Sequence, residues 1–230
     1  MEFVYADVLK ARYRVFGEYY RLDIGPQRLL CRRRVEIVTA ELDMTGSQPD
    51  AVLILMNPGN IRLVDAEVEI PVVPSGRLDE LETLNALHAL KPDNTQYQLM
   101  RLMRLMGWCR LRLINLSDVC DANSQSFASR LPQLLDDHPG LPHSILDPQR
   151  QAEWRFLMGT TSEGAQGMPV PIAAWGSNSA LEAQALECLE RIPNLLGLPL
   201  DAPWFRFASP YRKDQKLAWL EGMHQLLTES

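Results

Sequence analysis

The sequence predicts an α/β fold: a three-layer αβα sandwich with a central, mainly four-stranded parallel sheet and an N-terminal β-hairpin extension. Three observations predict it. From residue 51 onward, short apolar runs alternate with helical patterns, each run ends in turn-forming residues, and each is followed by a helix or a long crossover. We expect a single domain of 230 residues, with residues 1–50 as the extension and residues 51–230 as the αβα core.

The first 50 residues predict the hairpin. The segments "EYYRLDI" and "RLLCRRRVEIVTAEL" are typical of two strands on either side of the turn-forming pair Gly25-Pro26. Arg32, Arg33 and Arg34 lie inside the second strand. We interpret them as a solvated edge that discourages strand pairing, with phosphate contact as the alternative.

The first strand of the core ends abruptly. The apolar run "AVLILM", residues 51–56, leads directly into "NPG", residues 57–59, which cannot continue a buried strand. A long irregular segment, residues 58–92, follows. This ending raises the question of why an amide side chain stands on a stiff turn at the end of a buried strand.

The remaining elements alternate regularly. The pattern predicts a helix in "PDNTQYQLMRLMRLMGW", capped by Asp93 or Asn94 and ended by Gly107. Later strands are expected at residues 111–116, 169–175 and 203–208. Further helices are expected at residues 148–158, in "NSALEAQALECLERI" and in "KDQKLAWLEGMHQLLTE".

Composition excludes several classes of protein. A net charge of −6 gives the whole molecule no attraction for nucleic acid or an anionic membrane, although a local basic patch remains compatible with it. The N-terminus lacks the apolar run of a signal peptide, and no stretch of about 18 apolar residues occurs. We therefore expect a cytoplasmic protein that does not associate with membranes.

The four cysteines predict free thiols, buried or half-buried in a protein of a reducing compartment, rather than a metal site. Cys31, Cys109, Cys120 and Cys188 form no CxxC pair, and the four histidines show no spacing typical of metal ligands. We expect no metal and no cofactor.

The predicted strands all end in small, polar or turn-forming residues, in the segments "MNPGN", "INLSD", "AWGSN" and "ASPYR". The carboxyl ends of parallel strands lie at one edge of a sheet, where ligands bind. Asn57, Asn115, Trp175-Gly176 and residues 209–212 are therefore expected to converge on one cleft.

The ordered motifs "LILMNPG", "PDNTQYQLMRLMRLMGW", "LRLINLSDV" and "AAWG" resemble the DUF1643 family, a bacterial group named for its unknown function. The same order resembles the uracil-DNA glycosylase superfamily, particularly its mismatch-specific thymine/uracil branch. The matching elements are Asn57-Pro58-Gly59, Pro92-Asp93-Asn94, Asn115-Leu116, Gly176 and Ser209-Pro210. The resemblance spans residues 50–228 and implies a uracil-DNA glycosylase-like fold.

The resemblance also implies roles for the first motif. Asn57 would position the water that attacks the anomeric carbon of the sugar, and the turn of Met56, Pro58 and Gly59 would contact the base through its backbone. Cleavage of an N-glycosidic bond needs a placed water and donors aimed at the leaving base rather than a strong nucleophile.

The other strand ends would recognise the base. The Asn115 amide offers a paired donor and acceptor for the edge of a nucleobase, beside the strand end at Gly176. Trp175 or Tyr97 would stack on the base face, with core packing as the alternative for both aromatic rings.

The final loop departs from the family pattern. It reads "ASPYRKD" and lacks the histidine of the better-known uracil enzymes, so Arg212 would have to replace that donor to the base. We predict that this loop contacts phosphate at the rim of the cleft, next to the N-terminus of the final helix. Its residues are Ser209, Pro210, Tyr211, Arg212 and Lys213. The alternative is a solvated turn with Asp214 as the acidic residue of the first helical turn.

The segment after the first motif is long and acidic, which is unusual near a surface that follows a DNA backbone. We interpret it as a solvated lid or insertion; alternatively, it adapts the cleft to a free nucleoside or another small molecule. Asp65, in this segment, is a candidate general base.

Two principal functional hypotheses follow. The first is a hydrolase of N-glycosidic bonds, acting on a modified or mismatched base in DNA or on a nucleoside-like molecule. The second is a non-catalytic module that binds a nucleobase, a nucleotide or nucleic acid on the same scaffold, because a fold does not confer an activity. A more remote alternative is an interaction protein that binds through the strip "WFRFASPYRKDQK". The sequence gives no oligomeric state.

Overall fold

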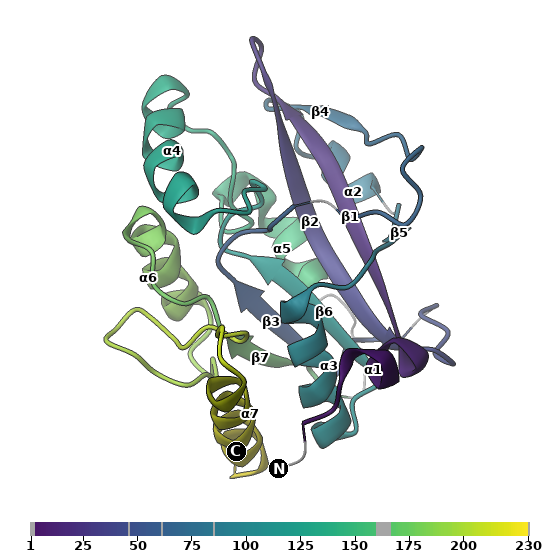
Figure 1. Ribbon diagram of the computed structural model, residues 1–230. Helices are drawn as coiled ribbons and strands as arrows, with labels where there is room; N and C mark the ends of the chain where they lie inside the picture. Colours follow the sequence, from purple (N-terminus) through teal and green to yellow (C-terminus); the bar gives the residue numbers. More distant parts are fainter. Residues whose placement is uncertain (1–2, 46, 61, 85, 160–166, 230) are drawn as a thin grey trace.

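A mixed seven-stranded sheet forms the centre of the molecule (Figure 1), in a computed structural model that describes residues 3–45, 47–60, 62–84, 86–159 and 167–229. The strand order is β4-β1-β2-β6-β3-β7, and β5 pairs with β1. The strands are β1 (Tyr13–Asp23), β2 (Arg28–Thr39), β3 (Ala51–Leu55), β4 (Val72–Pro74), β5 (His88–Ala89), β6 (Arg110–Asn115) and β7 (Val170–Ala173). The predicted α/β class is confirmed, but the expectation of a mainly parallel, four-stranded sheet is wrong.

Three of the four predicted parallel strands are present. β3 lies between β6 and β7 and runs parallel to both. The fourth prediction, at residues 203–208, is wrong: Phe205 forms only isolated antiparallel bridges, to Gly176 and Pro199. The outer edge of β7 is occupied by Leu196, whose backbone bonds to Pro171 and Ala173. No edge of β7 is therefore left for residues 203–208.

Helices cover both faces of the sheet (Figure 1). On one face, α1 (Ala6–Arg12), α3 (Asn94–Met106) and α7 (Lys213–Glu229) contribute Leu9, Leu99 and Trp219 to a core shared with β3 and β6. The opposite core contains side chains of α2 (Glu80–Thr83), α4 (Ser124–Asp137), α5 (Gln151–Leu157) and α6 (Glu182–Arg191). Short 3₁₀ turns at Pro148–Arg150 and Ser179–Leu181 precede α5 and α6. Among the described residues, no helix has both the length and the apolar composition to cross a membrane.

The ends of α3 follow the local chemistry of its sequence. Asp93 accepts a hydrogen bond from the Gln96 backbone, and the Gln96 side chain accepts one from the Asp93 backbone, so the two form a capping box. Gly107 ends the helix in the left-handed conformation, with φ of 71°. Both predicted boundaries are confirmed. By contrast, no helix was predicted at α4, which carries Pro132 in its interior.

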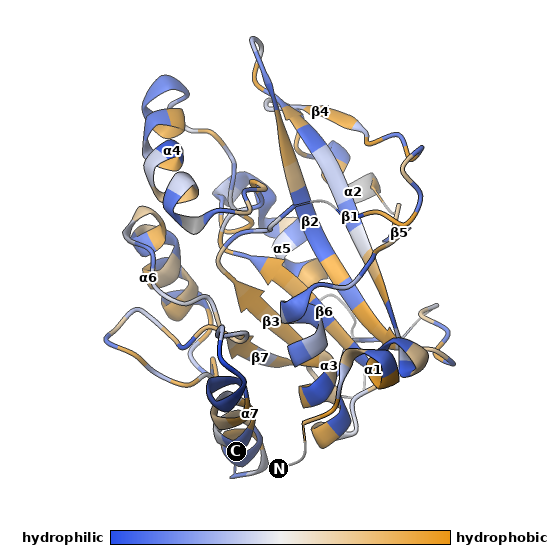
Figure 2. Ribbon diagram, in the orientation of Figure 1, coloured by the Kyte–Doolittle hydropathy of each residue, from blue (hydrophilic) through white to orange (hydrophobic). Residues whose placement is uncertain are grey.

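The N-terminal hairpin is confirmed, and it belongs to the main sheet rather than lying beside it. β1 and β2 pair in antiparallel fashion, and β2 also pairs with β6. Figure 2 shows a hydrophilic stretch in the middle of β2, beside a neutral to hydrophilic part of β1, whereas β3 is apolar. Arg32, Arg33 and Arg34 are all buried, so the prediction of a solvated edge is wrong.

A β-bulge separates these three arginines. Tyr19 pairs with Arg32 and Glu18 pairs with Arg34, which leaves Arg33 as the extra residue on β2. As a result Arg33 and Arg34 reach the same carboxylate: each donates to Glu18 Oε2, at 2.9 and 2.8 Å. Arg32 lies on the other face of the sheet, with Tyr19 and the α3 core.

The face with Arg33 and Arg34 carries a buried ionic cluster. Glu36 on β2 is completely buried and accepts hydrogen bonds from Arg112 Nε at 2.7 Å and Arg110 Nε at 3.0 Å. Burial alone would raise the pKa of the Glu36 carboxyl, but the Arg112 and Arg110 guanidinium groups hold it below its usual value. These pairs therefore connect β2 to β6 through charge as well as through the strand ladder.

The helix α5 closes this cluster. Glu153 accepts hydrogen bonds from Arg33 Nε and Arg150 Nε, both at 2.7 Å. The ring of Phe156 lies 5.0 Å from the guanidinium carbon of Arg34 and 5.4 Å from that of Arg112. One network of buried ion pairs thus fixes the positions of three strands and one helix.

Replacing Glu36 tests this cluster. Glu36→Gln should lower the free energy of unfolding by about 3–5 kcal/mol, because it leaves buried guanidinium groups without their anion. Chemical denaturation at neutral pH measures the loss. As a control, Asp7→Asn removes the exposed Asp7–Lys10 pair, 3.8 Å apart, and should cost less than about 1 kcal/mol. Equal, small losses in both variants would contradict a structural role for the cluster.

Candidate functional site

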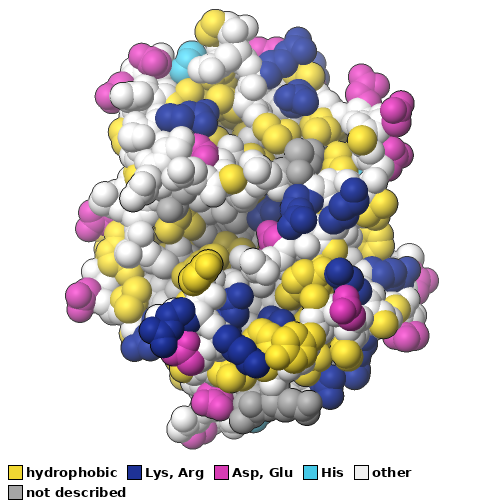
Figure 3. Space-filling view, viewed as in Figure 1, with side chains coloured by type: hydrophobic (Ala, Val, Ile, Leu, Met, Phe, Trp, Pro, Cys, Tyr) yellow, Lys and Arg dark blue, Asp and Glu magenta, His cyan; other side chains and the backbone are white. Residues whose placement is uncertain are grey.

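A pocket of ≈ 600 Å³ opens at the carboxyl ends of β3 and β6 and beside the residues that follow β7. Leu55 and Leu113 line it from the sheet, and Phe207 and Leu200 line it from the C-terminal segment. Figure 3 shows a hollow on this face of the molecule, with lysine and arginine side chains on its rim. The volume lies within the range of about 300–1,000 Å³ typical of small-molecule sites.

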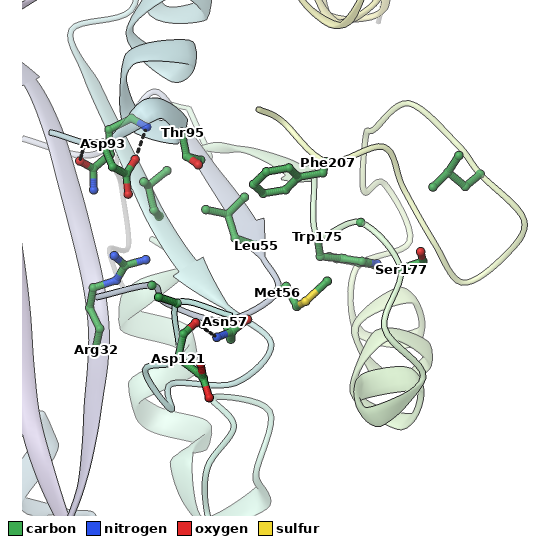
Figure 4. A pocket seen from close by; sticks show the side chains of 16 residues that line it. Arg32, Leu55, Met56, Asn57, Asp93, Thr95, Asp121, Trp175, Ser177 and Phe207 are labelled. Carbon is green, nitrogen blue, oxygen red and sulfur yellow. Dashed lines mark hydrogen bonds between the residues drawn. The ribbon is translucent and has the colours of Figure 1, made fainter. Parts of the chain in front are cut away.

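Asn57 lines this pocket and also holds its turn in place (Figure 4). Its Nδ2 donates to the carbonyl oxygens of Pro58, at 3.0 Å, and Asp121, at 2.9 Å. Asp121 in turn donates its backbone N–H to the Pro58 carbonyl, at 2.8 Å. The Oδ1 atom of Asn57 accepts no hydrogen bond from any residue that the structure describes, so it remains available as an acceptor.

Most of the other predicted base-contacting residues lie around the same pocket. Met56, Gly59, Trp175 and Gly176 line it, whereas Pro58 is buried behind the turn. The Trp175 ring is fully buried, its Nε1 donates to the Pro203 carbonyl at 3.1 Å, and it meets Phe205 edge to face at 5.2 Å between ring centroids. Core packing, the alternative considered for Trp175, therefore accounts for most of its contacts.

Asn115 is adjacent to the pocket but closed off from it. It shares a face of β6 with the pocket residue Leu113 and pairs in register with Leu55, which also lines the pocket. The side chain is fully buried, and neither its Nδ2 nor its Oδ1 has a hydrogen-bond partner among the described residues. Such an orphaned amide is rare in a protein interior and costs stability unless a ligand or water satisfies it.

The structure does not bring the remaining predicted site residues to the pocket lining. Asp65 is exposed, and its Oδ1 accepts from the Glu67 backbone at 2.9 Å. Tyr97 packs against the α3 core, with Lys10 Nζ 5.8 Å from its ring centroid.

The five predicted phosphate contacts, Ser209, Pro210, Tyr211, Arg212 and Lys213, also lie outside the residues that line the pocket. Arg212 pairs with Asp214 at 2.7 Å, and Lys213 Nζ donates to the Tyr5 hydroxyl at 3.1 Å. Tyr211 is 97% exposed, whereas the Ser209 hydroxyl is buried without a partner in the described part of the chain.

Several polar residues of the pocket were not predicted as site residues. They are Arg32, Asp93, Thr95, Gln96, Asp121 and Ser177. Asp93, Thr95 and Gln96 form the start of α3. The capping residues predicted where this helix begins, but not that its first turn lies beside the end of β3. The signal for Arg32 was the run of three arginines. Phosphate contact was an alternative for the whole run, and nothing in the sequence distinguished Arg32 from its two neighbours.

The strand end after β6 also supplies a carboxylate that turns away from the pocket. Asp118 is completely buried and accepts hydrogen bonds from Arg150 at 2.8 Å and Tyr20 at 2.9 Å. Burial raises the pKa of Asp118 to about 6, although Arg150 acts in the opposite direction. His143 lies nearby, with Nδ1 3.0 Å from Ser117 Oγ, and burial lowers its pKa to about 4.

The described residues contain no cluster of three or more histidine, cysteine, aspartate or glutamate side chains that could hold a metal ion. The cysteines are free thiols, as predicted. Cys31 and Cys188 are buried and Cys120 is half-buried, but Cys109 is exposed, so the expectation of a buried or half-buried thiol is wrong there.

Fold and site together define an α/β protein with a ligand-sized pocket at the carboxyl ends of its parallel strands. Comparisons with protein-family models, with curated proteins and with solved structures give no match to this chain. The resemblance to the uracil-DNA glycosylase superfamily therefore rests on the sequence motifs alone.

The raised pKa of Asp118 predicts a pH-dependent stability. Below pH 4 the carboxyl is protonated in both the folded and the unfolded states; between about pH 4 and 6 only the folded state retains the proton. The stabilisation from Asp118 is thus full below its unfolded pKa and is lost as the pH rises through about 6. Relative to Asp118→Asn, the wild type should lose roughly 2–3 kcal/mol between pH 4 and 7. Urea denaturation of both proteins at each pH measures the difference, and a constant difference would contradict the raised pKa.

Proposed function

We propose that this protein binds a nucleoside-like small molecule in the pocket and hydrolyses its N-glycosidic bond. The observation that carries the proposal is the hydrogen bonding of Asn57. Both hydrogen bonds of its Nδ2 go to backbone carbonyls, which fixes the amide and leaves Oδ1 to accept a hydrogen bond from a water molecule. A fixed acceptor in a ligand-sized pocket is the arrangement that a placed nucleophilic water requires.

The proposed reaction uses Asn57 for orientation and not for proton transfer. A water O–H donates to Oδ1, and the water oxygen forms a bond to the anomeric carbon as the carbon–nitrogen bond breaks. The bonding electrons leave with the base, and the proton lost by the water passes to the base or to solvent. An amide is sufficient for this step because an oxocarbenium-like sugar reacts readily with a weak nucleophile that is already in place.

The pocket walls suit a planar, polar base. Met56, Leu55 and Phe207 offer apolar surfaces for its faces, while Gln96 and Ser177 offer donors and acceptors for its edge. As part of the same proposal, the fold is the αβα sandwich of the uracil-DNA glycosylase superfamily. The helices on both faces and the pocket at the strand ends support this assignment, and the antiparallel β1–β2 hairpin in the sheet departs from the predicted parallel pattern.

We favour a small molecule over DNA as the substrate. The predicted DNA-contacting rim has its Arg212 charge paired with Asp214, and the chain carries a net charge of −6. Both features weaken attraction for a nucleic-acid backbone.

A non-catalytic binding module is the second candidate. The observation that favours it is the same amide: two hydrogen bonds to carbonyls give Asn57 a sufficient structural reason to be present. In that case the pocket binds a nucleobase or nucleotide without cleaving it.

The test is base release from a panel of nucleosides, nucleoside monophosphates and base-modified oligonucleotides, followed by chromatographic detection of the free base. For the substrate that reacts, Asn57→Ala should reduce release by about 10²-fold or more, because the placed water is lost from the transition state. The same change should also cost about 1 kcal/mol of stability, since the part-buried Asp121 carbonyl loses its side-chain donor, whereas the Pro58 carbonyl keeps the Asp121 N–H.

A matched variant separates these two effects. Asn178 follows β7, caps the 3₁₀ turn by accepting from the Ala180 backbone and contacts Met56, but it does not line the pocket. Asn178→Ala should lower stability by about 1 kcal/mol and leave base release near that of the wild type. Equal base release by the two variants would refute the role of Asn57, and no release from any compound would favour the binding module.

A further inference from the structure

Of the three consecutive arginines in β2, Arg32 takes no part in the buried ionic cluster. The bulge in β2 sends Arg33 and Arg34 to Glu18, while Arg32 pairs across the strand with Tyr19 and lines the pocket. Figure 4 shows its guanidinium group extending from β2 into the pocket. One arginine of the triplet has therefore been directed to the candidate site while its two neighbours serve the structure.

This guanidinium group is buried without an anion. Arg32 is only 5% exposed, and its Nε has no hydrogen-bond partner among the described residues. Within the described ranges no carboxylate lies close enough to form an ion pair with it. The Tyr19 hydroxyl and the Cys120 thiol are among the polar groups near enough to interact with its charge. A buried charge costs several kcal/mol unless it is paired, so this position is suited to an anionic ligand.

Two carboxylates also line the pocket, but each already has donors of its own. Asp93 Oδ1 accepts from the Gln96 backbone at 2.9 Å as the cap of α3. Asp121 Oδ1 accepts from the Asn123 backbone at 2.9 Å, and its Oδ2 accepts from Arg130 Nη1 at 2.9 Å. Asp121 forms its ion pair with Arg130, and neither carboxylate forms an ion pair with Arg32 among the described residues.

The first turn of α3 adds a second contribution. This helix has 13 residues, and Thr95 and Gln96 at its N-terminus line the same pocket as Arg32. Figure 4 shows Asp93 and Thr95 on the side of the pocket next to Arg32. The Thr95 hydroxyl and backbone N–H make no hydrogen bond to any residue in the described ranges, and the helix dipole favours an anion at this end.

We infer that Arg32 and the first turn of α3 form an anion subsite that receives the phosphate group of a nucleoside monophosphate. The planar guanidinium fork matches two phosphate oxygens. Arg32 and Phe207 lie on opposite sides of the pocket, and Asn57 lies on a third side (Figure 4). A nucleotide with its phosphate at Arg32 and its base toward Phe207 places the sugar between them, next to Asn57. The assignment of a nucleotide rests on the proposed function, whereas the anion subsite can be tested without it.

The first experiment uses anions alone. At constant ionic strength, inorganic phosphate should raise the melting temperature of the wild type more than acetate does, and Arg32→Met should abolish the difference. Arg32→Met should itself melt higher than the wild type without added anion, because an unpaired buried charge is replaced by an apolar chain of similar length. Arg28→Met is the matched control: Arg28 lies on the same strand, is exposed and pairs with Asp23, so its phosphate response should equal that of the wild type.

The second experiment compares four nucleosides with their 5′-monophosphates by titration calorimetry. For the accepted base, the wild type should bind the monophosphate at least about tenfold more tightly than the nucleoside, and Arg32→Met should reduce this ratio to about one while nucleoside affinity stays within about twofold. An unchanged ratio in Arg32→Met, or an equal response of the wild type to phosphate and acetate, would overturn the subsite.

These outcomes are distinguishable from failure of the proposed hydrolase. If monophosphates bind through Arg32 but no base is released, the subsite stands and the hydrolase fails. If the wild type and Arg32→Met release base from nucleosides equally, with no preference for monophosphates, the hydrolase stands and the subsite is wrong.

Discussion

The buried ionic cluster between the sheet and α5 is the constraint on which the rest of the structure depends. Its charges can leave water only if each is paired, so the strands that carry them must keep one register. Glu36 binds arginines of β6, and Glu18 binds arginines of β2, which fixes the order of β1, β2 and β6. Because β3 pairs with β6, this constraint also sets where the first motif and its turn lie.

The bulge in β2 connects this constraint to the candidate site. A regular strand would alternate its side chains and send Arg32 and Arg34 to the same face. The extra residue, Arg33, changes the alternation, so that two successive arginines reach Glu18 and the third reaches the pocket. One local irregularity thus satisfies the cluster and leaves a buried cation beside the carboxyl ends of the parallel strands.

The sequence could predict those elements that depend on interactions between residues close together in the chain. The strand at 51–56, its turn at Asn57 and the caps of α3 depend on neighbouring residues, and the structure has all three. The failed strand at 203–208 depends on competition from Leu196 for the edge of β7, which no local pattern contains.

The site divides in the same way. The motif residues Met56, Asn57, Gly59, Trp175 and Gly176 reach one pocket because the ends of parallel strands must meet. Arg32 and Asp121 come from an antiparallel strand and a loop whose positions depend on long-range pairing. A sequence pattern could therefore indicate the apolar and turn-forming part of the pocket and the cap Asp93, but not that Arg32 and Asp121 reach it.

The most direct measurement is a crystal structure of the protein with the nucleoside 5′-monophosphate that it binds most tightly. The phosphate should lie within hydrogen-bonding distance of the Arg32 guanidinium group and the first turn of α3, with the anomeric carbon facing a water held by Asn57 Oδ1. A nucleotide bound outside this pocket, or inside it with its phosphate away from Arg32, would contradict the assignment of the pocket as a nucleotide site.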